Sequence, residues 1–140
     1  MEVVHPSRIL LVEDNPADVF LIKEAMRSHG IPFDLQWFAD GEDAVAHIEH
    51  MDPAGKVPDA ILLDLNLPKL DGKEVLARIR KNMRLAQVPV AILTSSDSPH
   101  DRREAARLGA SIYIRKPPTL DEFLDVGSTI KDLLDGTLAR

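Results

Sequence analysis

The feature that most constrains the fold is an alternation of short apolar runs with longer amphipathic stretches, repeated five times along the chain. The apolar runs have the length of buried strands, and the stretches between them carry apolar residues at helical spacing. Such an alternation predicts successive βαβ units around a parallel sheet. Because these crossovers are right-handed, alternate helices cover opposite faces, and the fold class is a doubly wound α/β sandwich. The expected strands are residues 9–12, 33–38, 60–64, 88–94 and 111–116.

Residues with capping preferences set the expected ends of the helices. Asn15 followed by Pro16 favours a helix start, and Gly30 can end that helix in a left-handed conformation. Thr119 has the spacing of a capping box for the last helix, whereas Gly127 lies inside this helix and is expected to weaken it. The helical stretches lie within residues 13–30, 41–51, 72–82, 98–110 and 117–136.

Composition excludes several classes of protein. The chain has 140 residues, the size of one domain, and its net charge of −6 argues against nonspecific nucleic-acid binding. It contains no cysteine, which rules out disulfides, thiolate metal sites and a cysteine nucleophile. No apolar stretch approaches the ~20 residues of a membrane span, and the N-terminus lacks the pattern of an export signal. We therefore expect a cytoplasmic protein without a membrane partner.

Polar side chains follow the central strands, at the edge where ligands bind in such sheets. Asp64 directly follows the apolar run Ile61–Leu63, although a carboxylate is rarely buried without a partner. The residues at the carboxyl ends of these strands are Glu13, Asp14, Asp64, Thr94, Ser95 and Lys116. Three carboxylates at one point repel each other, which favours a cation between them. An all-oxygen site completed by water and phosphate suits Mg²⁺ better than Ca²⁺.

This combination of groups is suited to phosphoryl transfer. An aspartate beside a metal ion can attack a phosphoryl group and form an acyl phosphate, while the metal and a lysine neutralise the phosphoryl oxygens. Thr94 could then hydrogen-bond the attached group. Asp64 would end its strand because the buried strand holds this carboxylate rigidly where the metal supplies the missing pairing.

The segments "LLVEDNPAD", "LLDLNLPKLDG", "ILTSS" and "YIRKP" resemble the motifs of CheY-like response regulator receiver domains, from about Arg8 to Leu134. The resemblance implies a flavodoxin-like sandwich with strand order 2-1-3-4-5, and a single receiver domain over residues 1–140 with no output domain. It implies a phosphoacceptor aspartate, Mg²⁺ ligands, phosphoryl-binding residues, an aromatic switch and a cis peptide bond. By this resemblance Asp64 is the phosphoacceptor, and the Mg²⁺ ligands are Asp14, Asp64 and the carbonyl of Asn66, with Glu13 acting through water. Thr94 and Lys116 would bind the phosphoryl group. Tyr113 would be the aromatic switch, and the Lys116–Pro117 bond would be cis.

More narrowly, the chain resembles the small response regulators that pair with phytochrome-type histidine kinases, so a sensor histidine kinase is the expected partner. Two positions depart from the commonest family pattern. Glu13 replaces a more usual aspartate, and Pro118 adds a second proline beside the active-site loop. Neither departure removes a group that phosphorylation needs.

Two interpretations of function remain open from the sequence. The first is a binding module switched by phosphorylation, and the second is a binding module whose acidic pocket is vestigial. The basic strip Arg102, Arg103, Arg107 and Arg115 could also meet the acidic residues Asp121, Glu122 and Asp125 of a second copy, which would give a homodimer through helix 4, strand 5 and helix 5.

Overall fold

Strands and helices alternate strictly along residues 5–136, which the computed structural model describes. The strands are β1 (Ser7–Val12), β2 (Phe33–Phe38), β3 (Ala60–Leu63), β4 (Val90–Thr94) and β5 (Ile112–Arg115). The helices are α1 (Pro16–Ser28), α2 (Gly41–Glu49), α3 (Gly72–Lys81), α4 (Pro99–Arg107) and α5 (Leu120–Asp135). Every expected element is present, with ends that differ by a few residues.

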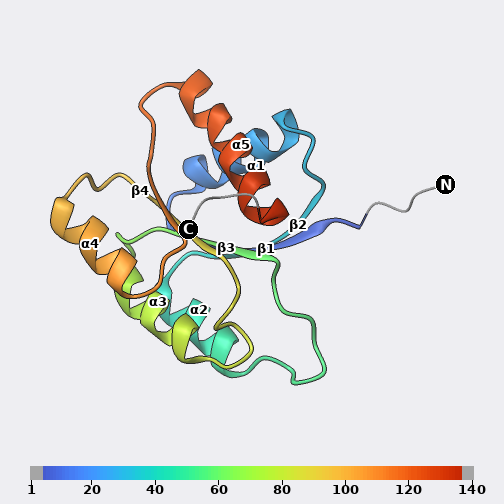
Figure 1. Cartoon of the computed structure of the whole chain (residues 1–140), viewed down its shortest axis with the longest axis vertical. Helices are drawn as coiled ribbons and strands as arrows, with labels where there is room; N and C mark the ends of the chain where they lie inside the picture. The colour runs from blue at the N-terminus through green and yellow to red at the C-terminus, as the bar shows by residue number, and fades with distance from the viewer. Residues whose placement is uncertain (1–4, 137–140) are drawn as a thin grey trace.

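The five strands form one parallel sheet in the order β2-β1-β3-β4-β5. Figure 1 shows the sheet nearly edge-on, with α1 and α5 above it and α2, α3 and α4 below it. The expected fold class and strand order are therefore confirmed. No helix within residues 5–136 is long and apolar enough to cross a membrane.

Each face of the sheet has its own apolar core, because successive side chains of a strand point to opposite faces. In β1, Leu10 and Val12 pack with α2 and α3, whereas Ile9 and Leu11 pack with α1 and α5. The central strands β3 and β4 are buried along their whole length, as expected for a parallel sheet covered on both sides. Both cores hold the carboxyl ends of these strands in place.

The helix ends follow the capping residues seen in the sequence. The Asn15 side chain accepts a hydrogen bond from the amide of Ala17, with Pro16 in the first helical position. The Thr119 side chain accepts from the amide of Glu122 and so begins α5. Gly30 has a φ of +67°, in the left-handed region that favours glycine.

Gly127 has a structural role that the sequence did not reveal. A Cβ atom at this position would lie 2.2 Å from the carbonyl oxygen of Ala25 and 2.4 Å from Cδ2 of His29. The glycine therefore allows α5 to lie directly against α1. Its low helix propensity is offset by this close packing.

Candidate functional site

Three carboxylates converge at the carboxyl edge of the sheet, after β1 and β3. The structure places Glu13, Asp14 and Asp64 so that one carboxylate oxygen of each lies within 4.8 Å of the others. Glu13 and Asp64 are buried, with 1% and 4% of their surface exposed, whereas Asp14 is open to solvent. The expected acidic cluster is thus assembled by the ends of two adjacent strands.

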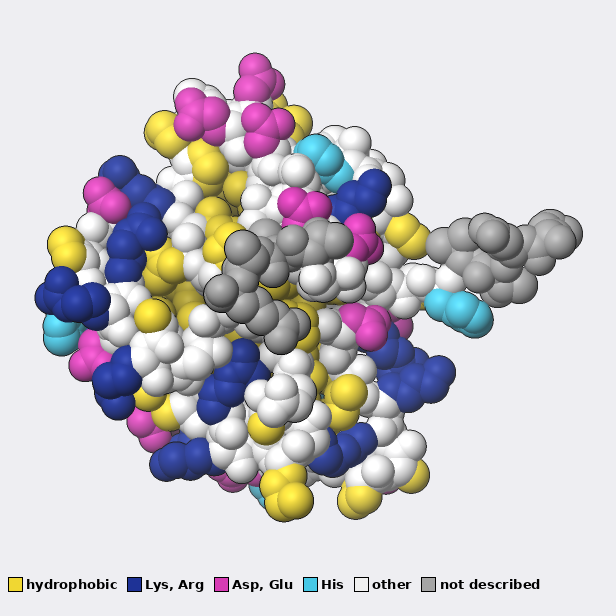
Figure 2. Space-filling model, in the orientation of Figure 1, with side chains coloured by type: hydrophobic (Ala, Val, Ile, Leu, Met, Phe, Trp, Pro, Cys, Tyr) yellow, Lys and Arg dark blue, Asp and Glu magenta, His cyan; other side chains and the backbone are white. Residues whose placement is uncertain are grey.

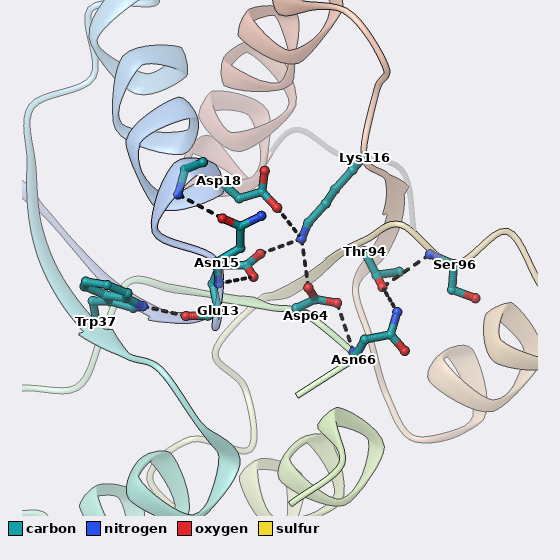
Figure 3. A network of polar contacts seen from close by, with 10 residues as sticks. Glu13, Asn15, Asp18, Trp37, Asp64, Asn66, Thr94, Ser96 and Lys116 are labelled. Atoms are coloured by element: carbon teal, nitrogen blue, oxygen red, sulfur yellow. Dashed lines mark hydrogen bonds and ion pairs between the residues drawn. The ribbon is translucent and has the colours of Figure 1, made fainter. Parts of the chain in front are cut away.

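Lys116 lies at the centre of this cluster. Its ammonium nitrogen is 2.7 Å from Glu13 Oε1, 2.8 Å from Asp64 Oδ2 and 2.8 Å from Asp18 Oδ2. Figure 3 shows Nζ between these carboxylates, reaching them from the end of β5. Asp18 was missed by the sequence analysis. The available signal was its place in the first turn of α1, directly after the strand end that carries Glu13 and Asp14.

Burial and charge act in opposite directions on these groups. Burial raises the pKa of Glu13 to about 7, and its hydrogen bond with Lys116 limits the rise. Burial alone would lower the pKa of Lys116, but hydrogen bonds to Asp18, Asp64 and Glu13 raise this pKa above its usual value. Lys116 therefore stays charged at neutral pH, as a residue that neutralises phosphoryl oxygens must.

Backbone and indole contacts fix the position of Glu13. The amide of Asn15 donates to Glu13 Oε2 (3.1 Å), and the indole Nε1 of Trp37 donates to the Glu13 carbonyl oxygen (2.6 Å). Trp37 remains 41% exposed. It therefore supports the end of the first strand and lies at the edge of the site, as Figure 3 shows.

Thr94 and Asn66 lie on the other side of Asp64. Thr94 is fully buried, and its Oγ1 accepts from Asn66 Nδ2 and from the amide of Ser96, both at 3.4 Å. The amide of Asn66 donates to Asp64 Oδ1 (3.0 Å). Thr94 and Asn66 thus flank the carboxylate, as Figure 3 shows. The role of the Asn66 carbonyl as a metal ligand stays a prediction.

Tyr113 is tied to the loop that follows Thr94. Its hydroxyl donates to the carbonyl oxygen of Ser96 (3.0 Å), and the guanidinium of Arg102 lies 4.5 Å from the centre of its ring. Ser96 in turn donates to Asp101 of α4, whose other oxygen is 2.6 Å from Lys73 of α3. A path of direct contacts therefore connects Thr94 to α4, although a switch of Tyr113 stays a prediction.

The expected cis bond before Pro117 is wrong. The peptide bonds of the described residues contain no cis bond, so Lys116 and Pro117 are joined in trans. The trans form is favoured by about 0.5–1 kcal/mol before proline. With this bond in trans, the Lys116 amide donates to the Thr94 carbonyl (2.7 Å) and its side chain still reaches the three carboxylates. The site therefore forms without a cis bond.

The donor set of the cluster fits a hard divalent cation. Its side-chain donors are all carboxylate oxygens, two on buried residues and one on an exposed residue, which leaves one side open for water or phosphate oxygens. Spacing alone would also allow His47 and His50, three residues apart at the end of α2, to bind a metal ion, but they do not form a comparable site. His47 packs against the ring of Phe38, and Nδ1 of His50 lies 2.8 Å from the carbonyl oxygen of Ala46.

Comparison with known proteins identifies the family to which this site belongs. Residues 9–126 match the response regulator receiver domain. The chain belongs to this family. It is 37% identical over 133 residues to the probable methanogenesis regulatory protein FilR2 of Methanothrix harundinacea, an alignment that covers 94% of the chain and 86% of FilR2. It is 39% identical over 119 residues to the response regulator Rcp1 of Synechocystis, covering 84% of the chain and 81% of Rcp1.

Two solved structures of response regulators have the same fold. The phosphorylated cyanobacterial phytochrome response regulator RcpA superimposes with a TM-score of 0.85 at 35% identity, covering 96% of this chain and 98% of RcpA. The Mn²⁺-bound form of Rcp1 superimposes with a TM-score of 0.83 at 35% identity and the same coverage. The chain is therefore a receiver domain of a two-component response regulator, a signalling protein with relatives among phytochrome response regulators. Its acidic pocket is compatible with Mg²⁺-dependent phosphorylation.

Proposed function

We propose that Asp64 is the phosphoacceptor of this receiver domain and takes its phosphoryl group from a histidine of a sensor kinase. An Asp64 oxygen forms the new bond to phosphorus, the bond from phosphorus to the imidazole nitrogen breaks, and that nitrogen keeps the electron pair and is protonated. The observation that carries this proposal is the Lys116 ammonium, held 2.8 Å from Asp64 within a buried acidic cluster.

The surrounding residues supply the other requirements of the reaction. Thr94 and Lys116 would hold the phosphoryl oxygens after transfer, and the support is that Lys116 hydrogen-bonds Asp64 while Thr94 accepts from Asn66, whose amide donates to Asp64. We assign Mg²⁺ to Asp14, Asp64 and the Asn66 carbonyl as direct ligands, with Glu13 acting through water. When bound, this ion would neutralise the negative charge of the phosphoryl oxygens.

The solvent exposure of Asp14 and Asn66 leaves a route for water to the acyl phosphate. We propose self-dephosphorylation on this ground. A water oxygen bonds to phosphorus, the bond to the Asp64 oxygen breaks, and the carboxylate and inorganic phosphate are released.

The proposed partner is a phytochrome-type histidine kinase in the cytoplasm. The support is the relation to Rcp1 and to RcpA, the latter described as a phytochrome response regulator. A phosphorylated kinase of this class, offered with Mg²⁺, should add one phosphoryl group to the chain.

The test is intact-mass measurement after incubation with acetyl phosphate or the phosphorylated kinase. The wild type should gain one phosphoryl group, and Asp64→Asn should gain none. Asp34→Asn makes the same change on an exposed residue of β2 and should be labelled like the wild type. Labelling that persists in Asp64→Asn would refute the assignment. An unlabelled wild type would favour the alternative of a vestigial pocket.

We also propose that phosphorylation changes association through α4, β5 and α5. Figure 2 shows blue side chains gathered at the left, over α4, and magenta ones at the top, over the start of α5. Among the described residues, Arg103 has no ion-pair partner, and the same holds for the acidic side chains of early α5: Asp121, Glu122 and Asp125. Unpaired charges of both signs on one face suit a second copy arranged about a twofold axis.

Sedimentation with and without beryllofluoride, a phosphoryl mimic, tests this association. The mimic should promote the dimer in the wild type and not in Arg103→Glu. An unchanged monomer that nevertheless binds the mimic would count against the dimer and leave the phosphorylation of Asp64 unaffected.

A further inference from the structure

We infer that Asp18 is a positioning residue, which holds the Lys116 ammonium beside Asp64 while the acidic cluster holds its metal ion. The inference rests on the proposed function and adds a residue to it. No motif assigned a role to Asp18, and its contact with Lys116 joins the first turn of α1 to the end of β5.

Lys116 uses its full donor capacity in this structure. An ammonium group has three N–H donors, and three carboxylate oxygens lie at 2.7–2.8 Å from its nitrogen. With only 12% of the side chain exposed, water has little access to replace any of them. The position of the ammonium group is therefore set by hydrogen bonds to Asp18 and Asp64 and by the ion pair with Glu13.

These three acceptors differ in what else they must do. Glu13 and Asp64 also belong to the group of carboxylates placed to share a metal ion, and Asp18 does not. A cation that engages Glu13 and Asp64 competes with Lys116 for their oxygens. Asp18 would then be the one carboxylate of the three that contacts Lys116 without also contacting the metal ion.

The position of Asp18 is itself well fixed. It is the third residue of α1, whose start is held by the Asn15 cap and by Pro16. A carboxylate is favoured at the N-terminus of a helix, and this one is only 18% exposed. A rigid acceptor of this kind restrains a lysine side chain that would otherwise sample many rotamers.

The negative charge of Asp18 also repels an incoming phosphoryl group, and the two effects oppose each other. Figure 3 shows the Lys116 nitrogen between Asp18 and Asp64, and this nitrogen is 2.8 Å from a carboxylate oxygen of each. The repulsion acts across the positively charged ammonium and at longer range, whereas a displaced ammonium would lose its direct contact with the phosphoryl oxygens, and Coulomb energies fall with distance. Asp18 should therefore assist phosphorylation.

The test compares Asp18→Asn and Asp18→Glu with the wild type. Glu24→Gln is the matched control, since Glu24 lies on the same helix and pairs with Arg27 at the surface, away from Lys116. Calorimetry gives the Mg²⁺ affinity, and intact mass gives the rate of phosphorylation by acetyl phosphate at saturating Mg²⁺. The fluorescence of Trp37, the only tryptophan, reports beryllofluoride binding.

Asp18→Asn should lower the phosphorylation rate and the beryllofluoride affinity by about tenfold while changing the Mg²⁺ affinity by less than about threefold. Asp18→Glu, which keeps the negative charge, should retain most of the wild-type phosphorylation rate and beryllofluoride affinity. Glu24→Gln should behave as the wild type, and all the variants should remain folded by circular dichroism. This separation of phosphoryl binding from metal binding is not expected of a purely structural residue.

An Asp18→Asn protein with the wild-type rate and mimic affinity would overturn the inference. An equal loss of Mg²⁺ affinity, a failure of Asp18→Glu to restore the rate, or the same loss in Glu24→Gln would also overturn it. The NMR signal of the Lys116 ammonium separates this inference from the proposed function. It should be protected from hydrogen exchange in the wild type and lose that protection in Asp18→Asn, whether or not Asp64 accepts a phosphoryl group.

Discussion

Helices α5 and α4 contact the rest of the molecule in different ways. Five residues of α5 are buried against α1 and the sheet: Phe123, Val126, Gly127, Ile130 and Leu133. On α4, Ala105 alone is buried. Polar contacts supply other links of α4, among them the ion pairs of Lys73 with Asp101 and of Asp97 with Arg102.

This difference separates a rigid part of the molecule from one that can move. Burying a large apolar side chain contributes about 1.5–3 kcal/mol, whereas an ion pair near the surface contributes about 0–1 kcal/mol. The α1–α5 layer therefore holds Asp18 and Lys116 in place, and α4 can shift at low cost. A structural change that begins at Thr94 should therefore displace α4 rather than α5.

The largest expected effect comes from Gly127→Ala, in the rigid layer. At an exposed helix position this change would stabilise the protein by about 1 kcal/mol. Here the new methyl group would meet the Ala25 carbonyl at 2.2 Å, so α5 must move away from α1. We expect the free energy of unfolding to fall by about 3 kcal/mol, measured by urea denaturation.

Ser128→Ala is the control for this change. Ser128 is the exposed neighbour of Gly127 on α5, and its replacement should alter stability by no more than about 0.5 kcal/mol. A Gly127→Ala protein as stable as the wild type would show that the α1–α5 contact is looser than the structure indicates.

A smaller effect is expected from Ala105→Gly, at the one buried position of α4. Losing a buried methyl group and gaining backbone freedom should together cost about 1–2 kcal/mol. Hydrogen exchange should accelerate in α4 and stay unchanged in α5. Equal acceleration in both helices would mean that they open as one unit and that α4 is no more mobile than α5. Ala106→Gly, on the exposed side of the same helix, separates the backbone contribution from the loss of burial.

The sequence predicted those parts of the fold that depend on local patterns. Asn15, Pro16 and Thr119 began their helices as expected, because a cap acts on amides only two or three residues away. The strand order was predicted from a family resemblance, since periodicity alone does not specify which strands are neighbours, and the structure confirmed it. The cis bond at Pro117 rested wholly on that resemblance and was wrong.

The contacts that the sequence did not predict join elements that are distant along the chain. Asp18 and Lys116 are 98 residues apart, and only the folded structure shows that their side chains meet. From the sequence, Gly127 indicated only a weak helix. The structure shows that a Cβ atom at this position would clash with the Ala25 carbonyl oxygen, so a glycine is needed for helix packing. The cluster of Glu13, Asp14 and Asp64 was predictable because the carboxyl ends of adjacent parallel strands must lie at one edge.

The smallest expected effect is that of Asp101→Asn, which removes the ion pair between α4 and Lys73. Both side chains are about one quarter exposed, at 23% and 26%, so the loss of stability should be about 0.5 kcal/mol. The variant should nevertheless change the NMR signals of the Tyr113 ring, because Asp101 also accepts from Ser96, whose carbonyl holds the Tyr113 hydroxyl.

The difference in unfolding free energy between the wild type and Asp101→Asn is small, so its dependence on pH gives a sharper test than its size. Hydrogen bonds from Lys73 and Ser96 lower the pKa of Asp101, so its contribution is present above the unfolded value of 3.8 and is lost as the pH falls through the lower folded pKa. The hydrogen bond to Asp101 raises the pKa of Lys73, so its contribution is present below 10.5 and is lost as the pH rises through the higher folded pKa.

The difference in unfolding free energy between the wild type and Asp101→Asn should therefore be constant from about pH 5 to pH 9 and disappear in acid. His100 also faces Asp101 and lowers its pKa, so both proteins are compared in a His100→Gln background. A difference that still changes near neutral pH in that background would mean that another ionisable group holds α4. The attachment of α4 would then depend on pH in the physiological range, and the contrast with the apolar attachment of α5 would be larger than the structure indicates.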